Sequence, residues 1–502
     1  MPTAPAWRQA AIAMLLTALT CLWQLGAQPI SRSQELRVTE TAREMVASGD
    51  YLTPRFNGEL RFQKPPLAYW LTAASYRLLG RVDEFSARLP AALAAIGVML
   101  LVTGWTRRQF GEPAALGALA VLASSNITLR FFHTGETDPL LLLCVTAGAF
   151  AAWAAIRDER PQPGSRALLW AAVTGGALAK GLPPALLPLL AGVAWCGVTR
   201  HWRRIRALIW PPGVLLLVIV GGAWYLWLWR HHPEATATIL GREVRETYLH
   251  GDHPGPPWYY LPRVFLYFAP WSVLLPWLAC RGRRWPVEPV QGYLLVWLLV
   301  TFAILSANVN KQIQYALLLA PPLAILCGHA LAAGLPRARV WQTAACVFAV
   351  LLCAAGGYFA WHIGLRYLLW PALVGAAVFW LGPRQPMTGA LLLAVAMIGG
   401  FRLGEAHGLA RHADSAAQVR AVGMAARGLA PLLVVGLREV PLAFYAQAVL
   451  PTVDAADLAA HLPPDGELYV FAPGDRLSPP AGWRAEAILT QPKLSLWRLS
   501  PP

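Results

Sequence analysis

Lysine is rare in this chain, and its few lysines occupy informative positions. Only four of the 42 basic residues are lysines, and the other 38 are arginines. Lys64, Lys180 and Lys311 each lie at the end of a strongly apolar segment, whereas Lys493 lies in a polar tail. A compact ammonium suits phosphate binding, while arginine serves equally well for interfacial snorkelling. The first three lysines therefore predict a phosphate site, with snorkelling as the alternative.

Acidic residues beside apolar segments form a second group. Glu35 begins an amphipathic segment just after the first apolar run, and Glu136 and Asp138 lie between two later runs, in FFHTGETDPLLLL. A carboxylate near hydrocarbon needs a partner or a function, because an unpaired charge is strongly disfavoured there. Asp138 is a candidate for catalysis, or alternatively for capping the following helix, with Pro139 at its first position.

Other polar residues have simpler interpretations. Glu40 and Glu44 lie one helical turn apart beside arginines, so we expect them to be solvated partners. His133, His250 and His253 lack clustered partners at metal-ligand spacing, which weakens any metal site built on them. We assign the aromatic side chains at 258–260 and 271 to a membrane-interface belt.

The composition identifies an integral membrane protein. Hydrophobic residues make up 56% of the 502 residues, charged residues only 14%, and the mean hydropathy is +0.45. A soluble globule of this size could not bury so much apolar surface. The net charge of +16 comes without a basic tract carrying interleaved aromatics, so we expect no nucleic-acid partner. Seven cysteines without C-x-x-C spacing argue against a disulfide framework and a zinc site.

Apolar runs of roughly 20 residues, the length that spans a bilayer, predict about thirteen transmembrane helices. We read the first as a retained span rather than a signal peptide. The predicted spans centre near Leu16, Gly97, Ala120, Ala147, Ala172, Leu190, Val218, Phe265, Leu298, Leu319, Val350, Ala376 and Val395.

Arginines in alternate connections predict the orientation. They occur at 107–108, 157–166, 199–206, 281–285, 337–339 and 384. Short arginine-rich loops face the cytoplasm, so the N-terminus is predicted inside and, after an odd number of spans, the C-terminus outside.

Three segments are predicted on the outer side. The first outer loop, 28–86, holds two amphipathic segments at 33–48 and 64–79 that we expect along the membrane surface, with Ser33 as cap and Asn57–Gly58 as turn. A polar loop at about 230–257 could act as a lid. Residues 402–502 alternate strand-like and helical runs, which predicts a small α/β domain. The fold class is thus an all-α polytopic membrane domain, 1–401, followed by this tail.

Several of these segments resemble one family. The block QELRVTETAREMVASGDYLTPRFNGELRFQKPPLAYW, followed by TDP, AKG, PPWYY and NVNKQIQYALLLAPPLAIL, is similar to the aminoarabinose transferase of lipid A and to the protein mannosyltransferases. The resemblance covers about the first 330 residues. It implies a glycosyltransferase of the GT-C fold that uses a polyprenyl-phosphate-linked sugar.

The resemblance also implies site residues. The family's acidic pair on the first outer loop corresponds to Gln34 and Glu35, and its second outer-loop aspartate to Asp138. Its lysine and arginine associated with the lipid phosphate correspond to Lys64 and Arg37.

Further correspondences are Lys311, in an outer loop, and Glu243 and His253, in the lid-like loop. The chain departs from the pattern at Gln34, where the family has aspartate, and at Gln63, where it has glutamate. A neutral amide cannot take a proton or hold a metal strongly, so a divalent metal is disfavoured and no other cofactor is implied.

The implied function is transfer of a sugar from a polyprenyl-phosphate donor to a lipid A-like or other envelope acceptor, at the outer face of the inner membrane. One alternative is an inactive assembly subunit, since Gln34 and Gln63 replace two acids. A lipid or sugar transporter is less well supported, because the charges gather at one face and no internal repeat is evident.

Overall fold

The computed structural model describes residues 6–158, 162–234, 236, 253–276, 288–333, 380, 385–406, 413–437, 441–464, 466–474 and 477–501. The chain divides into two compact units. We call Met1–Trp23, Gln63–Leu67 and Ala91–His407 the helical unit, and Gln24–Phe62, Ala68–Pro90 and Gly408–Pro502 the mixed unit. The mixed unit therefore combines two segments that are far apart in the sequence.

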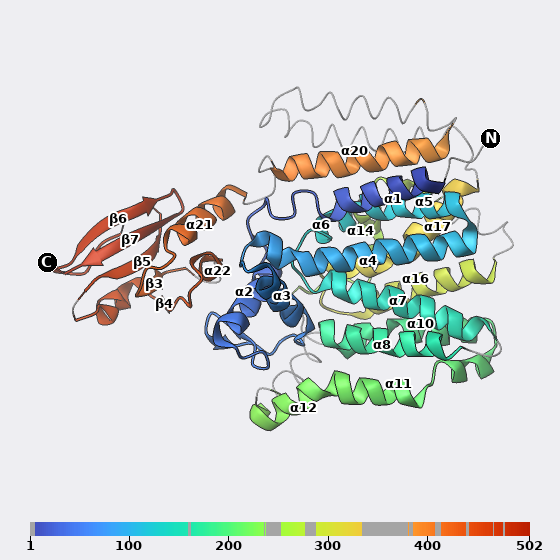
Figure 1. The fold of residues 1–502 in the computed structure, drawn as a ribbon, viewed down its shortest axis with the longest axis horizontal. Coiled ribbons are helices and arrows are strands. Elements are labelled where there is room, and N and C mark those ends of the chain that lie inside the picture. The colour runs from blue at the N-terminus through green and yellow to red at the C-terminus, as the bar shows by residue number, and fades with distance from the viewer. Residues whose placement is uncertain are drawn as a thin grey trace. The chain divides into compact units, whose positions relative to one another are not determined.

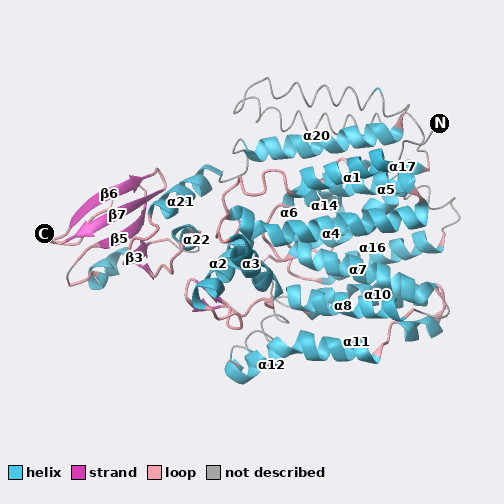
Figure 2. Ribbon diagram, viewed as in Figure 1, coloured by secondary structure: helices cyan, strands magenta, loops and turns pink. Residues whose placement is uncertain are grey.

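Helices that run side by side form the helical unit (Figures 1 and 2). In chain order they are α1 (Ala6–Cys21), α4 (Glu84–Phe110, in this unit from Ala91 on), α5 (Glu112–Ser124), α6 (Asn126–Phe131), α7 (Asp138–Arg157), α8 (Pro163–Lys180), α9 (Leu182–Ala185), α10 (Leu187–Val198), η1 (Trp202–Ala207), α11 (Pro211–Leu216), η2 (Leu217–Gly221), α12 (Gly222–His231), α14 (Tyr260–Tyr267), η3 (Trp271–Val273), α16 (Pro289–Ala307), η4 (Ile313–Leu319), α17 (Ala320–Ala332) and α20 (Pro386–Ala406).

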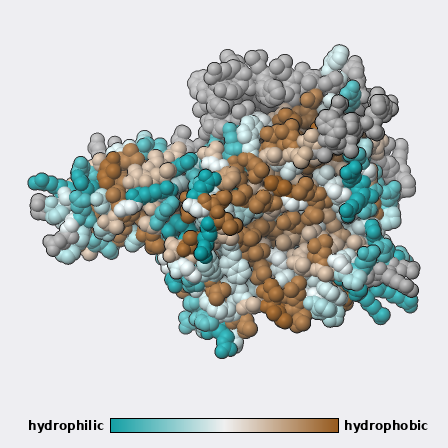
Figure 3. All heavy atoms as spheres, viewed as in Figure 1, coloured by the Kyte–Doolittle hydropathy of each residue, from teal (hydrophilic) through white to brown (hydrophobic). Residues whose placement is uncertain are grey.

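Many of the predicted spans coincide with apolar helices. Within the described residues, five helical stretches are long and apolar enough to cross a membrane: Glu84–Phe110, Asp138–Arg157, Pro211–His231, Pro289–Ala307 and Ile313–Ala332. Four shorter apolar helices lie at Ala11–Cys21, Glu112–Ser124, Leu187–Val198 and Met387–Arg402. Leucine, isoleucine and valine side chains remain exposed on several of these helices (Figure 3), as expected for surfaces that face lipid.

Of the four remaining predicted spans, the structure describes two. The segment around Ala172 is the helix α8. The segment around Phe265 is broken into α14 and η3, with Pro270 between them. A proline lacks the N–H that a continuous helix needs, so the apolar run is not one helix. The predicted spans at Val350 and Ala376 lie outside the described residues.

Small residues let helices of this unit approach closely. A Cβ added to Gly328 on α17 would lie 2.2 Å from the backbone nitrogen of Ala118 on α5. The two helices are thus in backbone contact, a packing mode typical of membrane helices. Any larger residue at Gly328 would push α5 and α17 apart.

A buried arginine joins three helices of the helical unit. Arg402, on α20, donates to the backbone oxygens of Thr20 on α1 (2.7 Å) and Leu129 on α6 (3.2 Å). Its guanidinium also pairs with Glu405 at 2.6 Å. An ionisable group at this depth is tolerated because each interaction supplies an acceptor. The predicted domain boundary at 401 falls inside α20, which continues to Ala406.

The first part of the mixed unit contains the two predicted amphipathic helices, α2 (Ser33–Ser48) and α3 (Leu67–Leu79). A short hairpin of β1 (Arg55–Phe56) and β2 (Glu59–Leu60) lies between them in the chain. Asn57 and Gly58, at φ 52° and 81°, form its turn, as predicted. The predicted cap is wrong, because α2 begins at Ser33 itself, with Arg32 in the capping position.

A five-stranded sheet forms the second part of the mixed unit. Its order is β4-β3-β5-β7-β6, where β3 pairs in parallel with β4 and β5, and β7 pairs antiparallel with β5 and β6. Strand-like runs of the sequence correspond to β3, β5 and β7. The elements are α21 (Ala413–Ala425), β3 (Leu432–Val435), α22 (Leu442–Ala446), β4 (Thr452–Val453), η5 (Ala455–His461), β5 (Leu468–Pro473), β6 (Arg484–Thr490) and β7 (Leu494–Ser500).

Specific polar contacts hold the two parts of the mixed unit together. The Tyr445 hydroxyl donates to Glu84 at 3.1 Å and accepts from the backbone N–H of Ile30 at 2.7 Å. The Asn57 side chain donates to the Leu450 carbonyl and accepts from its N–H, each at 2.7 Å. The buried Glu84 and Tyr445 side chains are thereby hydrogen-bonded, and the partly buried Asn57 is held at both ends of its amide.

The expectation that Glu40 and Glu44 are solvated is wrong. Glu40 has no exposed surface and pairs with Arg43 at 2.6 Å. Burial raises the pKa of Glu40 to about 7, although Arg43 acts in the opposite direction. Glu44 is also buried and accepts from the backbone N–H of Gly58 at 3.0 Å. The helical spacing was correct, but tertiary packing covers both carboxylates.

Candidate functional site

An ion pair joins the ends of two helices in the helical unit. Asp138 begins α7, Lys180 ends α8, and the Lys180 ammonium lies 2.5 Å from a carboxylate oxygen of Asp138. Only 6% of Asp138 is exposed. Each charge lies at the helix end that favours it, since the helix dipole stabilises anions at N-termini and cations at C-termini. The Asp138 carboxylate therefore lies in a largely dry environment with a cation as its partner.

Asp138 does not occupy the capping position of α7. Thr137 occupies the capping position, without a side-chain cap hydrogen bond, and Asp138 is the first helical residue. The Asp138 carboxylate contacts Lys180, which is 42 residues away along the chain. The scarcity of lysine pointed to Lys180 as part of a phosphate site, but it did not predict the pairing with Asp138.

A second buried lysine lies in the same unit. Lys311 is 4% exposed, and its ammonium donates to the backbone oxygens of Leu305 (2.9 Å) and Ser306 (2.7 Å). It also lies 5.7 Å from the centre of the Tyr260 ring. No carboxylate pairs with Lys311 in the described parts of the chain, and burial lowers the pKa of this ammonium. Two backbone oxygens thus hold the ammonium, and one of its three N–H donors is not used by these two contacts.

The segment at the start of η4 connects these two lysines. Tyr260 donates its hydroxyl to the Gln312 carbonyl at 2.9 Å, directly beside Lys311 in the chain. Tyr315, one turn further on, places its ring 4.8 Å from the Lys180 ammonium. We call Asp138, Lys180, Lys311, Tyr260 and Tyr315 the lysine site. Four elements of one unit, α7, α8, α14 and the η4 segment, position it.

The aromatic-belt assignment is wrong for two residues. Tyr260 has no exposed surface, and Trp271 is 3% exposed with its indole N–H donating to Ser124 at 2.9 Å. Side chains buried in protein cannot lie among lipid headgroups. Trp258, by contrast, is 65% exposed.

The other site residues predicted in this part of the sequence are Gln63, Lys64, His253 and Glu243. Gln63 is exposed and Lys64 is half-buried. The backbone oxygen of His253 accepts from the Lys311 N–H at 2.8 Å, while its side chain is exposed. Glu243 lies outside the described residues.

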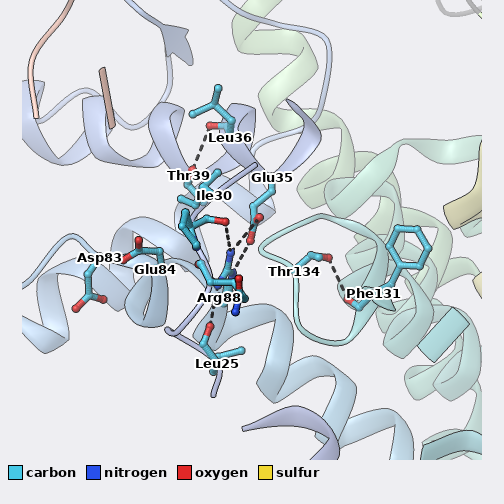
Figure 4. A network of polar contacts seen from close by, with 12 residues as sticks. Leu25, Ile30, Glu35, Leu36, Thr39, Asp83, Glu84, Arg88, Phe131 and Thr134 are labelled. Carbon is cyan, nitrogen blue, oxygen red and sulfur yellow. Dashed lines mark hydrogen bonds and ion pairs between the residues drawn. The ribbon is translucent and has the colours of Figure 1, made fainter. Parts of the chain in front are cut away.

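Glu35 belongs to the mixed unit and is held by an arginine. It is 1% exposed, and Arg88 donates to its two carboxylate oxygens at 2.7 and 3.3 Å (Figure 4). Arg88 also donates to the carbonyls of Leu25 (2.9 Å) and Gln28 (2.8 Å). Arg88 thus gives the buried Glu35 carboxylate a cationic partner and fixes the chain just before α2.

Gln34 and Arg37 lie on either side of Glu35 in the sequence and are half-buried. The structure therefore places Gln34, Glu35 and Arg37 in one unit, and Asp138 and Lys311 in the other. No group of three or more His, Cys, Asp or Glu side chains with metal-binding geometry occurs among the described residues.

Comparisons with known proteins define the class of this chain. Residues 63–227 match the family described as dolichyl-phosphate-mannose-protein mannosyltransferase. The fold resembles that of the archaeal oligosaccharyltransferase from Archaeoglobus fulgidus, with a TM-score of 0.52 and 12% identity, covering 89% of this chain and 64% of that one. The chain has the fold of the GT-C membrane glycosyltransferases.

More similar relatives narrow this class. ArnT from Cupriavidus metallidurans, in its crystal structure bound to undecaprenyl phosphate, gives a TM-score of 0.83 at 22% identity and covers 99% of this chain and 98% of that one. The undecaprenyl phosphate-alpha-4-amino-4-deoxy-L-arabinose arabinosyl transferase of Edwardsiella ictaluri is 31% identical over 320 residues, which are 62% of this chain and 57% of that protein. The chain thus spans less than two thirds of the length of this curated relative. The predicted resemblance to the aminoarabinose transferases is confirmed.

Proposed function

We propose that this protein is a membrane glycosyltransferase that moves a sugar from a polyprenyl-phosphate donor to a lipid A-like or other envelope acceptor. The observation that carries the proposal is the lysine site, where Asp138 pairs with Lys180, and where Lys311 has only backbone oxygens as acceptors among the described residues. One relative is named as an undecaprenyl phosphate-alpha-4-amino-4-deoxy-L-arabinose arabinosyl transferase, and ArnT was solved bound to undecaprenyl phosphate. Both names support this donor class.

In the proposed reaction, an acceptor hydroxyl attacks the anomeric carbon of the donor sugar. The new bond joins the acceptor oxygen to that carbon, and the carbon–oxygen bond to the lipid phosphate breaks, with its electron pair leaving on the phosphate. Asp138 or Glu35 takes the hydroxyl proton and stabilises positive charge that develops on the sugar. Lys180 positions Asp138 through their ion pair. Gln34 orients a substrate group.

Binding of the lipid phosphate is assigned to Lys64, Arg37 and Lys311. A lipid-linked donor needs no nucleotide, which agrees with the absence of a phosphate loop from the sequence. Gln63, Glu243 and His253 complete the proposed binding residues. A transfer assay with purified protein, polyprenyl-phosphate sugars and a membrane acceptor extract tests the proposal. Donor binding without transfer would instead indicate an inactive assembly subunit.

The lysines should show measurable effects on donor affinity. We expect Lys64→Ala and Lys311→Ala each to weaken binding of polyprenyl-phosphate sugar by roughly 10-fold or more, the value of one charge-assisted hydrogen bond. Lys64→Arg should recover only part of the loss, because a planar fork replaces a compact ammonium. Titration of the purified variants with the lipid donor measures the effect.

Lys493 serves as the matched control for this series. It is exposed and donates to Ser415 at 2.6 Å within the mixed unit. Lys493→Ala should bind the donor like the unmodified protein. Equal affinity for all of these variants would show that the lysines are interfacial anchors.

We also propose the finer topology. It comprises about thirteen spans, a cytoplasmic N-terminus and a periplasmic C-terminus in the inner membrane, with 1–401 as the transmembrane domain and 402–502 as an outer-face domain. A reporter active only outside the cytoplasm should work when fused after Pro502 and fail when fused near Arg204 or Arg283. The reverse pattern would contradict an active site on the outer face.

A further inference from the structure

A basic cleft lies within the mixed unit, apart from the lysine site. Its volume is about 720 Å³, within the range of small-molecule sites. The end of α3, the loop that follows and the first residue of α4 supply Arg77, Arg81, Asp83 and Glu84. The end of α21 and the residues after it supply Arg420 and Arg427. Segments separated by more than 300 residues in the sequence therefore form its walls.

Four arginines and two acidic residues line this cleft. Asp83 pairs with Arg81 at 3.1 Å, and Glu84 pairs with Arg420 at 3.2 Å. Glu84 also accepts from the Tyr445 hydroxyl, so it is held against the wall. The two carboxylates thus neutralise two of the four guanidinium groups.

The other two arginines of the cleft have neutral hydrogen-bond acceptors. Arg77 donates to the Tyr51 hydroxyl at 3.1 Å, and Arg427 donates to the Tyr445 carbonyl at 2.8 Å. Both acceptors are neutral, and neither arginine pairs with a carboxylate in the described ranges. Both side chains are also exposed. The cleft thus presents two oriented guanidinium groups, one from each wall, to a ligand.

We infer that this cleft binds a phosphate-bearing sugar headgroup, and that the headgroup belongs to the anionic glycolipid acceptor. Guanidinium forks bind phosphate oxygens in pairs, and two forks supplied by separate segments of a cleft of this size suit a bulky phosphorylated headgroup better than a small ion. The assignment to the acceptor rests on the proposed function. The anion site itself rests only on the cavity and its charges.

Direct binding to the full-length protein in detergent tests this inference. The probes are diphosphoryl lipid A, the same lipid without its phosphates, and inorganic phosphate. We expect the diphosphoryl lipid to bind at least 10-fold more tightly than its dephosphorylated form. In the double variant Arg77→Gln with Arg427→Gln, we expect that preference to disappear. Arg498→Gln, which removes an exposed arginine paired with Glu467 and Glu486, is the matched control and should keep it.

Three results would contradict different parts of this inference. If the double variant keeps the preference for the diphosphoryl lipid, the cleft is not its site. If inorganic phosphate competes as well as the lipid at equal concentration, the cleft is a free-phosphate site and the acceptor assignment is wrong. Binding of undecaprenyl phosphate should be unchanged in the double variant, which also confirms that it is folded. If the unmodified protein does not bind undecaprenyl phosphate, the proposed function fails, whatever the result for the cleft.

Discussion

Replacing Asp138 by asparagine should lower turnover by roughly 100-fold or more, while the protein still inserts and accumulates normally. The amide keeps the size of the side chain and its hydrogen-bonding oxygen, but it cannot accept a proton or balance positive charge on the sugar. Steady-state transfer from polyprenyl-phosphate sugar measures the loss. We expect the effect on turnover rather than on donor affinity, because the phosphate is assigned to other residues.

Controls separate this role from a structural one. Asp158→Asn changes an exposed aspartate that pairs with Arg157 beyond the other end of α7, and it should leave turnover unchanged. Glu35→Gln should lower turnover as Asp138→Asn does, but it should also lower stability, because Arg88 stays buried without its carboxylate partner. Gln34→Ala should have a milder effect on turnover. Normal turnover by Asp138→Asn would show that the ion pair with Lys180 only holds two helices together. A severe effect at Gln34 with none at Glu35 would reverse the assignment of that pair.

Removing the Arg88 side chain should have the largest effect on stability. Arg88→Ala leaves the Glu35 carboxylate buried without its partner, and breaking a buried pair in this way costs about 3–5 kcal/mol. It also removes the donors to the carbonyls of Leu25 and Gln28. We expect a clearly lower thermal midpoint for the purified protein in detergent, with poor recovery from the membrane.

Two comparisons sharpen this prediction. Arg157→Ala breaks an exposed pair and should cost about 1 kcal/mol or less. Combining Arg88→Met with Glu35→Leu removes both charges, so it should recover part of the stability lost in Arg88→Ala. If Arg88→Ala melts like Arg157→Ala, the Glu35 carboxylate is solvated and the buried pair is not important for folding.

The sequence determined features that depend on short stretches of chain. Apolar runs around Gly97, Ala147, Leu298 and Leu319 predicted membrane-length helices, because hydropathy over about 20 residues is a local property. Asn57–Gly58 predicted the hairpin turn for the same reason, since backbone conformation there depends on two residues. The scarcity of lysine directed attention to Lys180 and Lys311, although it did not reveal which groups these lysines contact.

The tertiary structure alone decided which charges meet and which are buried. Asp138 pairs with Lys180 across 42 positions, and Glu35 pairs with Arg88 across 53. Tyr445 reaches Glu84 across 361 positions, which places the tail in the same unit as the first loop. Glu40 lies on the predicted helix but is covered by packing that its spacing does not reveal. Ion pairing depends on distances of a few ångströms between side chains, and those distances are fixed only when distant segments fold against each other.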